Sequence, residues 1–330
     1  MAGRDSSSPV GSWSPSAATP GTIRGAASTF AGEPATTMSE PPSGDITVGV
    51  VQTPAGGIGP AAVLDLGRTL GRHDLLVFPE MANTPYFPLA GVDPRNRPGP
   101  QALPLEEVVD PFRTLAGRLD SNLVVGVCFT DGRRVHNAAV VLDRDGRIVE
   151  GRGVTSGEYH AVYEKTHLCT VRGYGSTFVE DEHFEAGPEL LTWDLDFGRI
   201  GVLVCYDRHF PGAWATLTAN SADIVAVPTA SPQGTEPTFA AEMQAMALQQ
   251  SAIVAVANRH GREVLGDSDV TYLGQSMVIG PDGRIARIAD AGSVTTATGA
   301  FAKTAVATTA RAMGIRGAQR PDLYTYRLTS

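Results

Sequence analysis

Residues 199–212 read Arg-Ile-Gly-Val-Leu-Val-Cys-Tyr-Asp-Arg-His-Phe-Pro-Gly. The continuous apolar run over 200–204 has the length of a β-strand and is typical of a strand buried inside a sheet. Cys205 closes this run, and the residues after it are predicted to leave the strand in a sharp turn into a helix. In α/β folds the carboxyl ends of strands carry reactive side chains, so the stretch indicates both the fold class and a candidate nucleophile.

The same kind of apolar run recurs along the chain, and helix-like stretches separate several of the runs. Helices are predicted near residues 60–72 and 104–119. Two Asp-Gly pairs, at 145–146 and 282–283, predict hairpin turns in which the glycine has a positive φ. Strands are predicted over 46–52, 75–78, 123–127, 138–142, 199–204, 223–227 and 252–257. Strands that alternate with helices place the chain in the α/β class.

The chain divides by composition into a leader and one folded domain. Residues 1–44 are rich in Ser, Pro, Ala, Gly and Thr and show no periodicity, which predicts a disordered leader. The apolar run after Asp45 starts the folded domain, expected over 45–330. Residues 289–312 are rich in Ala and Thr with weak patterning, so we expect a partly irregular C-terminal tail from about residue 289.

Composition excludes several classes of protein. Of the 330 residues 42% are hydrophobic, enough for a large core, and no apolar run reaches the ~20 residues of a membrane-spanning helix. The formal net charge of −9 argues against a nucleic-acid partner. Three widely spaced cysteines, Cys128, Cys169 and Cys205, form no CxxC pair, so a disulfide framework is not expected and the reducing cytoplasm is the predicted compartment.

Three side chains outside the ordinary surface pattern are candidates for chemistry. Cys205 is either a nucleophile, with the positive end of the following helix favouring its thiolate, or an inert core thiol. Glu80 ends the apolar run 75–79, so its carboxylate needs a buried partner or serves as a base. Lys165 is either a cation that pairs with a carboxylate and stabilises an oxyanion or an exposed lysine of an edge strand.

Taken together, these three segments resemble a known family. The segments are Phe-Pro-Glu with Glu80, Glu-Lys-Thr-His-Leu with Lys165, and Gly-Val-Leu-Val-Cys-Tyr-Asp with Cys205. The order of these three residues resembles that of the Glu-Lys-Cys triad of the nitrilase superfamily, the carbon-nitrogen hydrolases. The resemblance runs from about residue 45 to about residue 287. It implies an α/β fold in the form of a four-layer α-β-β-α sandwich that assembles through its helical faces into homodimers or larger homo-oligomers.

The resemblance also implies roles for the residues. Cys205 is expected to attack the substrate carbonyl carbon, Glu80 to act as general base and acid, and Lys165 to stabilise the tetrahedral intermediate together with the backbone N–H of Tyr206. A second glutamate of the family corresponds to Glu180, with Glu182 as the competing position in an acidic stretch that could also be a solvated loop. The resemblance requires no metal and no organic cofactor.

Two departures from the family pattern border the expected site. Cys169 stands where the family often has proline, and it is expected to be a bystander thiol. Residues 150–162 form a longer link into the lysine segment than is usual. Both departures leave the shape of the pocket open.

The residues after the nucleophile narrow the substrate class. Tyr206-Asp207 replaces the Trp-Glu of nitrile-cleaving relatives and points to amides; the segment through Pro211 resembles the branch that hydrolyses N-carbamoyl groups. In that branch Arg208 would hold a substrate carboxylate; the alternative is an arginine paired with Asp207 or another acidic neighbour. The segment 227–237, which contains Thr229, resembles the loop that forms one wall of the substrate pocket.

The match continues with the segment Asn258-Arg259-His260-Gly261-Arg262-Glu263. In this segment Arg259 and Glu263 are expected to pair locally in a structural role. Irregularly spaced histidines, and the absence of Gly-x-Ser-x-Gly and Gly-x-Gly-x-x-Gly motifs, argue against zinc, serine-hydrolase and dinucleotide sites. The sequence therefore predicts a thiol hydrolase acting on a small N-carbamoyl amino acid or ureido acid. The alternatives are an ω-amidase or aliphatic amidase, and a catalytically silent binding protein on the same fold.

Overall fold

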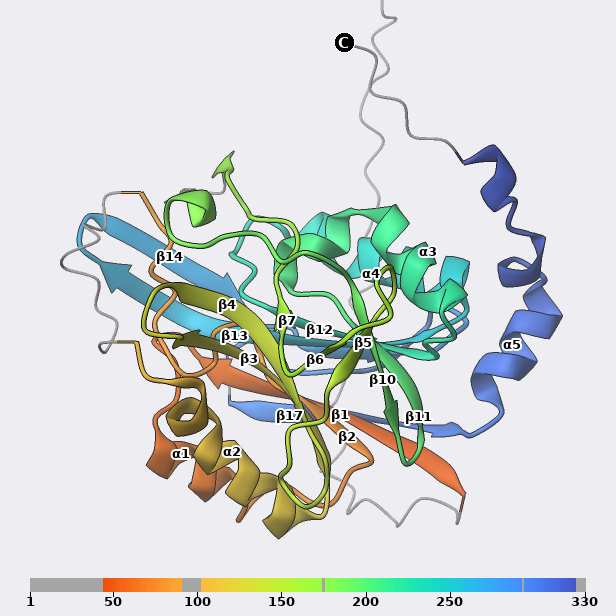
Figure 1. The fold of residues 1–330 in the computed structure, drawn as a ribbon, viewed down its shortest axis with the longest axis horizontal. Helices are drawn as coiled ribbons and strands as arrows, with labels where there is room; N and C mark the ends of the chain where they lie inside the picture. Colours follow the sequence, from red (N-terminus) through yellow and green to blue (C-terminus); the bar gives the residue numbers. More distant parts are fainter. Residues whose placement is uncertain (1–43, 91–101, 174–175, 293, 325–330) are drawn as a thin grey trace, which may run out of the picture. The chain divides into compact units, whose positions relative to one another are not determined.

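The computed structural model describes residues 44–90, 102–173, 176–292 and 294–324. Apart from Gly44, the expected leader lies outside the described residues. The strands predicted from the apolar runs form two sheets that face each other (Figure 1). The first sheet contains β1 (Asp45–Pro54), β2 (Leu75–Val77), β3 (Asn122–Thr130), β4 (Val135–Leu142), β7 (Tyr163–Glu164) and β17 (Thr295–Ala302).

The second sheet contains β5 (Gly151–Gly153), β6 (Tyr159–His160), β10 (Leu191–Leu195), β11 (Gly198–Val202), β12 (Ile224–Thr229), β13 (Ile253–Leu265), β15 (Met277–Ile279) and β16 (Ile285–Ile288). The long strand β13 joins the sheets, because it runs parallel to β12 in its first half and pairs with the end of β1 at Arg259 and His260. Its last part forms a hairpin with β14 (Ser268–Leu273), and β8 (Arg172–Gly173) pairs with β9 (Ser176–Thr177).

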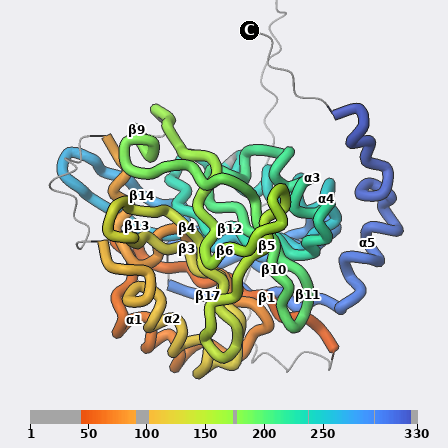
Figure 2. The backbone as a smooth tube through the Cα atoms, in the orientation of Figure 1, coloured from red at the N-terminus to blue at the C-terminus, as the bar shows by residue number. Residues whose placement is uncertain are grey.

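Alternating side chains of these strands build three separate apolar layers. Leu75 and Val77 point to the other sheet, whereas Leu76 and Phe78 pack against α1 (Pro60–Leu66) and α2 (Leu105–Leu119). On the opposite side Leu203 packs against α3 (Pro211–Ala219) and α4 (Glu236–Gln250). The tube view shows the same two helical layers on either side of the sheets (Figure 2). This arrangement confirms the predicted four-layer α-β-β-α sandwich.

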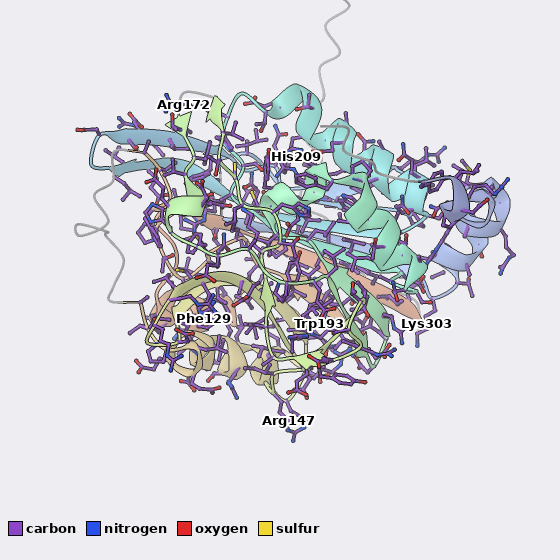
Figure 3. All side chains as sticks on the ribbon, turned by 45° about the horizontal axis from the view of Figure 1, so that its top comes forward. Phe129, Arg147, Arg172, Trp193, His209 and Lys303 are labelled. Atoms are coloured by element: carbon purple, nitrogen blue, oxygen red, sulfur yellow. The ribbon has the colours of Figure 1, made fainter. Side chains whose placement is uncertain are left out.

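The inner layer is the central core of the fold. Side chains from both sheets meet there, and the large indole of Trp193 is among them (Figure 3). Both predicted Asp-Gly turns are present, with Gly146 and Gly283 at φ of 78°. None of the described helices combines the length and apolar character that a membrane crossing needs.

The C-terminal region differs from the irregular tail that the sequence suggested. Residues 295–302 form β17, which pairs antiparallel with β1 from Asp45↔Ala302 to Gln52↔Thr295. The helix α5 (Ala305–Met313) follows. The weak pattern has a physical reason: apart from Phe301, β17 contains only Ala, Gly and Thr, so its pairing with β1, and not an alternation of large apolar side chains, defines the strand.

Candidate active site

Cys205 occupies a sharp turn between β11 and α3, as the sequence predicted. It is the first residue of a short 3₁₀ turn (Cys205–His209), and its φ is +50°, in the left-handed region that residues other than glycine rarely adopt. Such strained backbone persists only where the surrounding structure holds it, and it is frequent at functional sites. The turn therefore presents the thiol just after β11, whose last three residues are buried.

A buried carboxylate fixes this turn to the segment that carries Lys165. Asp207 Oδ2 accepts hydrogen bonds from the backbone N–H of Val204 at 3.0 Å and from the hydroxyl of Tyr163 at 2.8 Å. Asp207 Oδ1 accepts from the Thr166 hydroxyl at 2.9 Å and the His167 backbone N–H at 2.8 Å. The chain on both sides of Lys165 is thus tied to the nucleophile turn through a single side chain.

Three of the predicted site residues form one buried charged cluster. Lys165, Glu80 and Glu180 are fully buried. Lys165 Nζ lies 2.8 Å from Glu80 Oε1 and 2.6 Å from Glu180 Oε1. Glu182, the competing position, is exposed. Glu180, and not Glu182, therefore lies beside Lys165, and Lys165 is not an exposed lysine of an edge strand.

Two further side chains complete the cluster, and the sequence analysis missed both. Asn137 Nδ2 donates to Glu80 Oε1 at 2.8 Å, and the Tyr86 hydroxyl donates to Glu180 Oε1 at 2.5 Å. The backbone N–H of Cys169 donates to the other oxygen of Glu180 at 2.6 Å. Neither Asn137 nor Tyr86 stands in a distinctive motif, so the only available signal was a polar residue next to a buried strand.

The charges of the cluster shift the ionisation of its members. Burial by itself lowers the pKa of the Lys165 ammonium, but the carboxylates of Glu180 and Glu80 outweigh it and raise this pKa well above its ordinary value. Burial, followed by the Glu80 carboxylate, raises the pKa of the Cys205 thiol to about 11 against the opposing charges of Lys165 and Arg208. Desolvation therefore dominates, and the thiol is protonated at neutral pH.

One oxygen of Glu80 is available for proton transfer. Oε1 accepts from Lys165 and Asn137, whereas the buried Oε2 has no hydrogen-bond partner within the described part of the chain. A buried carboxylate oxygen without a partner is costly, and its presence in a cluster of charged groups indicates a functional position. Glu80 Oε2 can therefore accept a proton without breaking a bond that holds the cluster together.

Arg259 supports the backbone that carries Glu80. Its guanidinium is fully buried and donates from Nε to the carbonyl of Glu80 at 3.0 Å and from Nη2 to the carbonyls of Met81 and of Thr84, the latter at 2.6 Å. The predicted local pair with Glu263 is present, with Nη1 and Oε2 3.8 Å apart. Its main role, however, is to hold the turn after Glu80.

A small pocket of about 80 Å³ opens beside Cys205. Its wall combines apolar groups with hydroxyls, and its basic side chains are those of Arg208 and of His209, which is labelled in Figure 3. Cys169, which stands where the family often has proline, also lines it. The other lining residues are Tyr86, Val171, Phe178, Tyr206, Ala230, Ser231, Pro232, Thr235 and Thr238.

The structure shows the surroundings of Arg208 and Thr229, which the sequence did not specify. Arg208 Nε lies 3.3 Å from Glu242 Oε2, so the acidic neighbour exists, but it comes from α4 and is not Asp207. Arg208 Nη1 also donates to the carbonyl of Cys205 at 3.0 Å. Thr229 is fully buried, and the pocket wall expected from its loop is formed by the residues that follow it, beginning with Ala230.

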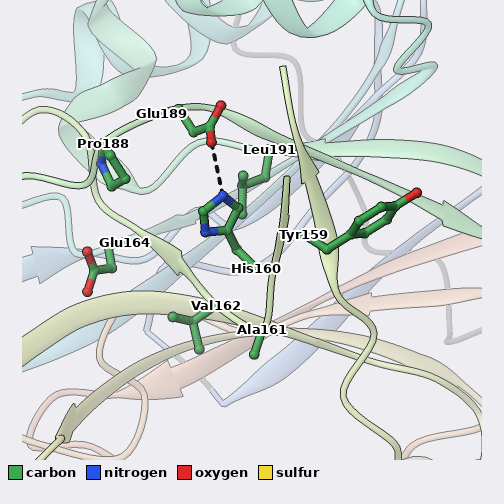
Figure 4. A pocket seen from close by; sticks show the side chains of 8 residues that line it. All are labelled: Tyr159, His160, Ala161, Val162, Glu164, Pro188, Glu189 and Leu191. Atoms are coloured by element: carbon green, nitrogen blue, oxygen red, sulfur yellow. Dashed lines mark hydrogen bonds and ion pairs between the residues drawn. The ribbon is translucent and has the colours of Figure 1, made fainter. Parts of the chain in front are cut away.

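A second, larger cavity of about 370 Å³ lies elsewhere in the molecule (Figure 4). It is lined by residues of the long link, of β7 and of the segment that leads into β10, and among them His160 Nε2 lies 2.9 Å from Glu189 Oε1. Neither Cys205 nor Glu80 nor Lys165 lines it. The pocket beside Cys205, and not this larger one, is therefore the candidate active site.

Comparison with known proteins agrees with this geometry. An N-carbamoylputrescine amidase from Arabidopsis thaliana is 27% identical over 61% of this chain and 67% of that protein. A citrullinase from Francisella tularensis is 26% identical over 62% of this chain and 65% of that protein. The crystal structure of a carbon-nitrogen hydrolase from Helicobacter pylori has the same fold, with a TM-score of 0.71 and 21% identity over 85% of this chain and 97% of that chain.

The family match covers most of the folded part of the chain. Residues 68–311 match the carbon-nitrogen hydrolase family, and this range includes Glu80, Lys165, Glu180 and Cys205. On this match and on the shared fold, the protein belongs to the carbon-nitrogen hydrolases of the nitrilase superfamily.

Proposed function

We propose that the protein is a cysteine-dependent hydrolase that cleaves the terminal C–N bond of an N-carbamoyl amino acid or a related ureido compound, giving ammonia, carbon dioxide and an amine. The observation that carries the proposal is the buried cluster of Glu80, Lys165 and Glu180 behind a pocket whose wall contains the Cys205 thiol. The resemblance to an N-carbamoylputrescine amidase and a citrullinase supports a ureido group as the reacting part of the substrate.

In the first half of the proposed reaction, Glu80 Oε2 takes the proton of the Cys205 thiol as the sulfur attacks the ureido carbonyl carbon. A base is needed because the thiol, with a pKa of about 11, is protonated at neutral pH. Lys165 and the backbone N–H of Tyr206 stabilise the negative oxygen of the tetrahedral intermediate. Glu80 then returns the proton to the leaving nitrogen, and ammonia departs from a carbamoyl thioester on Cys205.

In the second half, Glu80 removes a proton from a water molecule as the oxygen of that water attacks the thioester carbonyl carbon. Collapse of this intermediate breaks the C–S bond, returns a proton to Cys205 and releases a carbamate, which decomposes to carbon dioxide and the amine. Glu180 takes no proton in this scheme. Its carboxylate, held by Tyr86 and by the N–H of Cys169, keeps Lys165 charged and in place.

The pocket supports a substrate whose far end is anionic or neutral. Arg208 and His209 line it, and no Asp or Glu side chain does so among the described residues. A guanidinium suits a carboxylate, although Arg208 already faces Glu242. We therefore place N-carbamoyl amino acids ahead of N-carbamoyl amines as substrates.

A simple aliphatic amidase or ω-amidase is the second candidate. The pocket of about 80 Å³, with Val171, Phe178 and Pro232 in its wall, fits a short apolar amide as well as a small ureido acid. Both candidates use the same nucleophile and release ammonia. Only the far end of the substrate distinguishes them.

The test is ammonia release by the purified protein and its Cys205→Ala variant on a panel of substrates. The panel contains N-carbamoyl-β-alanine, N-carbamoyl-α-amino acids, N-carbamoylputrescine, a dicarboxylic ω-amide and a short aliphatic amide. Turnover of the ureido acids that depends on Cys205 supports the proposal. Turnover of the plain amides alone favours the amidase, and no turnover of any member by the unmodified protein contradicts both and favours a silent binding protein.

We also propose that the protein is a homodimer or larger homo-oligomer that pairs through α3 and α4. The sequence of α3 contains no charged residue and that of α4 only Glu236 and Glu242, whereas α2 carries five. Ala241→Glu on the exposed side of α4 is expected to give monomers in analytical ultracentrifugation, and Thr114→Glu on exposed α2 is the matched control. A monomeric unmodified protein contradicts this assembly.

The proposed compartment is the cytoplasm, because the three cysteines at 128, 169 and 205 are widely spaced and form no CxxC pair. Cell fractionation tests it, and recovery of the protein from an oxidising compartment contradicts it.

A further inference from the structure

The sulfur of Cys205 has a hydrogen-bond donor that the proposed mechanism does not use. β11 and β12 run parallel, with Val202 opposite Ala226, so their carboxyl ends meet at the same edge of the sheet. At this edge the Thr229 hydroxyl donates to Cys205 Sγ at 3.3 Å. Thr229 is fully buried, so no bulk water competes for this contact.

A second buried hydroxyl holds Thr229 in place. The Oγ atoms of Thr229 and Ser231 are 2.8 Å apart. Ser231 is fixed in turn by Asn258, whose Oδ1 accepts from the Ser231 backbone N–H at 2.8 Å and whose Nδ2 donates to the Ser231 carbonyl at 3.3 Å. Asn258 thus fixes the backbone of Ser231, whose hydroxyl contacts the Thr229 hydroxyl beside the sulfur.

The chemistry of the sulfur determines which atom donates in each of these hydrogen bonds. A thiolate has no proton and can only accept hydrogen bonds. The single hydroxyl proton of Thr229 is therefore directed at the sulfur when Cys205 is ionised, and the proton between the two hydroxyls must then come from Ser231. Both hydroxyls can adopt this direction together, since each has one proton and spare acceptor capacity.

We infer that Thr229, aligned by Ser231, is a catalytic residue that stabilises the Cys205 thiolate by donating a hydrogen bond to its sulfur. The inference rests on the proposed role of Cys205 as nucleophile and assigns Thr229 to the reacting atom instead of the substrate. The free thiol is hard to ionise, because its burial and the Glu80 carboxylate both oppose the negative charge. The Thr229 hydroxyl stabilises the thiolate against both effects, and because the hydroxyl is neutral it adds no charge to the cluster. The only other donor near the sulfur in the described residues is Arg208 Nη1, at the longer distance of 3.8 Å.

The test measures ionisation of the thiol without any substrate. The rate of alkylation of Cys205 by iodoacetamide is followed against pH in the intact protein, with the modified cysteine identified by mass, because Cys169 lines the same pocket. Thr229→Val keeps the shape of the side chain and removes the donor. It is expected to raise the apparent pKa of Cys205 by about one unit, a ~10-fold slower alkylation at neutral pH. Thr229→Ser, which keeps the hydroxyl, is expected to recover to within about threefold of the unmodified protein.

Ser231→Ala tests the alignment separately and is expected to slow alkylation two- to threefold. Thr218→Val is the matched control, because Thr218 is equally buried but its hydroxyl contacts Gln250 at 2.8 Å, away from the pocket. If Thr229→Val fails to fold, Thr229→Ala and Ser231→Ala carry the same comparison. An alkylation profile that is unchanged in the folded variants of Thr229 overturns the inference.

Turnover separates this inference from the proposed function. If the panel of substrates yields an active one, Thr229→Val is expected to lower kcat about tenfold with little change in KM. A raised KM with an unchanged alkylation profile assigns Thr229 to substrate binding and overturns the inference. If no substrate is turned over but the alkylation profile shifts, the proposed function fails and the role of Thr229 at the sulfur stands.

Discussion

The guanidinium of Arg259 donates to the backbone carbonyl of Glu80 at 3.0 Å, although the two residues are 179 positions apart. The same side chain donates to the carbonyls of Met81 and Thr84, so one buried cation binds three backbone carbonyls of the turn that follows β2. Met81 in this turn has a φ of +47°. The position of the proposed base therefore depends on β13, the strand that joins the two sheets.

Replacing Arg259 is expected to impair both stability and activity. Arg259→Lys keeps the charge but cannot reach three carbonyls with a planar fork, and it is expected to destabilise the fold by about 3 kcal/mol and to lower kcat at least tenfold. Thermal unfolding and ammonia release check this. Arg262→Lys is the control and is expected to behave like the unmodified protein, because Arg262 lies on the same strand as Arg259 but forms only an exposed ion pair with Asp269 of β14.

Removing the proposed base is expected to stop proton transfer while leaving the fold intact. Glu80→Gln still offers a hydrogen-bond acceptor to Lys165, but it cannot take the thiol proton. We expect kcat/KM to fall at least 100-fold, within the range for loss of a general base. Activity near that of the unmodified protein, at any pH up to 9, contradicts this role of Glu80.

The two neighbouring glutamates allow a matched comparison. Glu180→Gln weakens the partner that lies 2.6 Å from Lys165 Nζ, whereas Glu182→Gln changes an exposed side chain two residues away. Glu180→Gln is expected to lower kcat 10- to 100-fold and Glu182→Gln less than twofold, as measured by initial rates of ammonia release. Equal effects show that the buried position is not the one that matters.

Arg208 is expected to determine affinity for acidic substrates. Arg208→Ala should raise KM for ureido acids at least tenfold and change KM for short neutral amides little, because only the former offer a carboxylate. Arg208→Lys keeps the charge without the planar fork, so its KM for ureido acids should lie between those of Arg208→Ala and the unmodified protein. An equal loss on both substrate types assigns Arg208 to the support of the Cys205 turn, where it donates to the carbonyl of Cys205.

Ionisation of Cys205 predicts a loss of stability in alkaline solution. The folded-state pKa is raised from 9.0 to about 11, so the unfolded chain releases the thiol proton at lower pH than the folded chain does. The free energy of unfolding contributed by this group is therefore fully present below pH 9 and is lost as the pH rises from about 9 to about 11. Urea unfolding against pH is expected to show a smaller loss in Cys205→Ala than in the unmodified protein. Identical slopes contradict the raised pKa.

The sequence predicted much of the site because of where its apolar runs end. Glu80 and Cys205 follow buried strands, and the carboxyl ends of such strands gather at one edge of each sheet. The partners of these residues were not predictable, because they come from distant parts of the chain without a local motif. The Tyr86 hydroxyl meets Glu180 across 94 positions, and Arg208 faces Glu242 on another helix. The desolvation of Cys205 was also not predictable, because a sequence shows the helix that follows Cys205 but not the burial that raises the pKa of its thiol.

The pairing of β17 with β1 sets the time at which the protein can finish folding. β1 needs β17 along its length from Asp45 to Gln52, yet the paired residues lie 243 to 257 positions apart in the chain. While the chain is still on the ribosome, the edge of β1 that β17 will occupy stays open, and open edges invite pairing with other nascent chains. The sheet can therefore be completed only after residue 302 has emerged, and a chaperone that shields β1 until then is expected to raise the yield of the native protein.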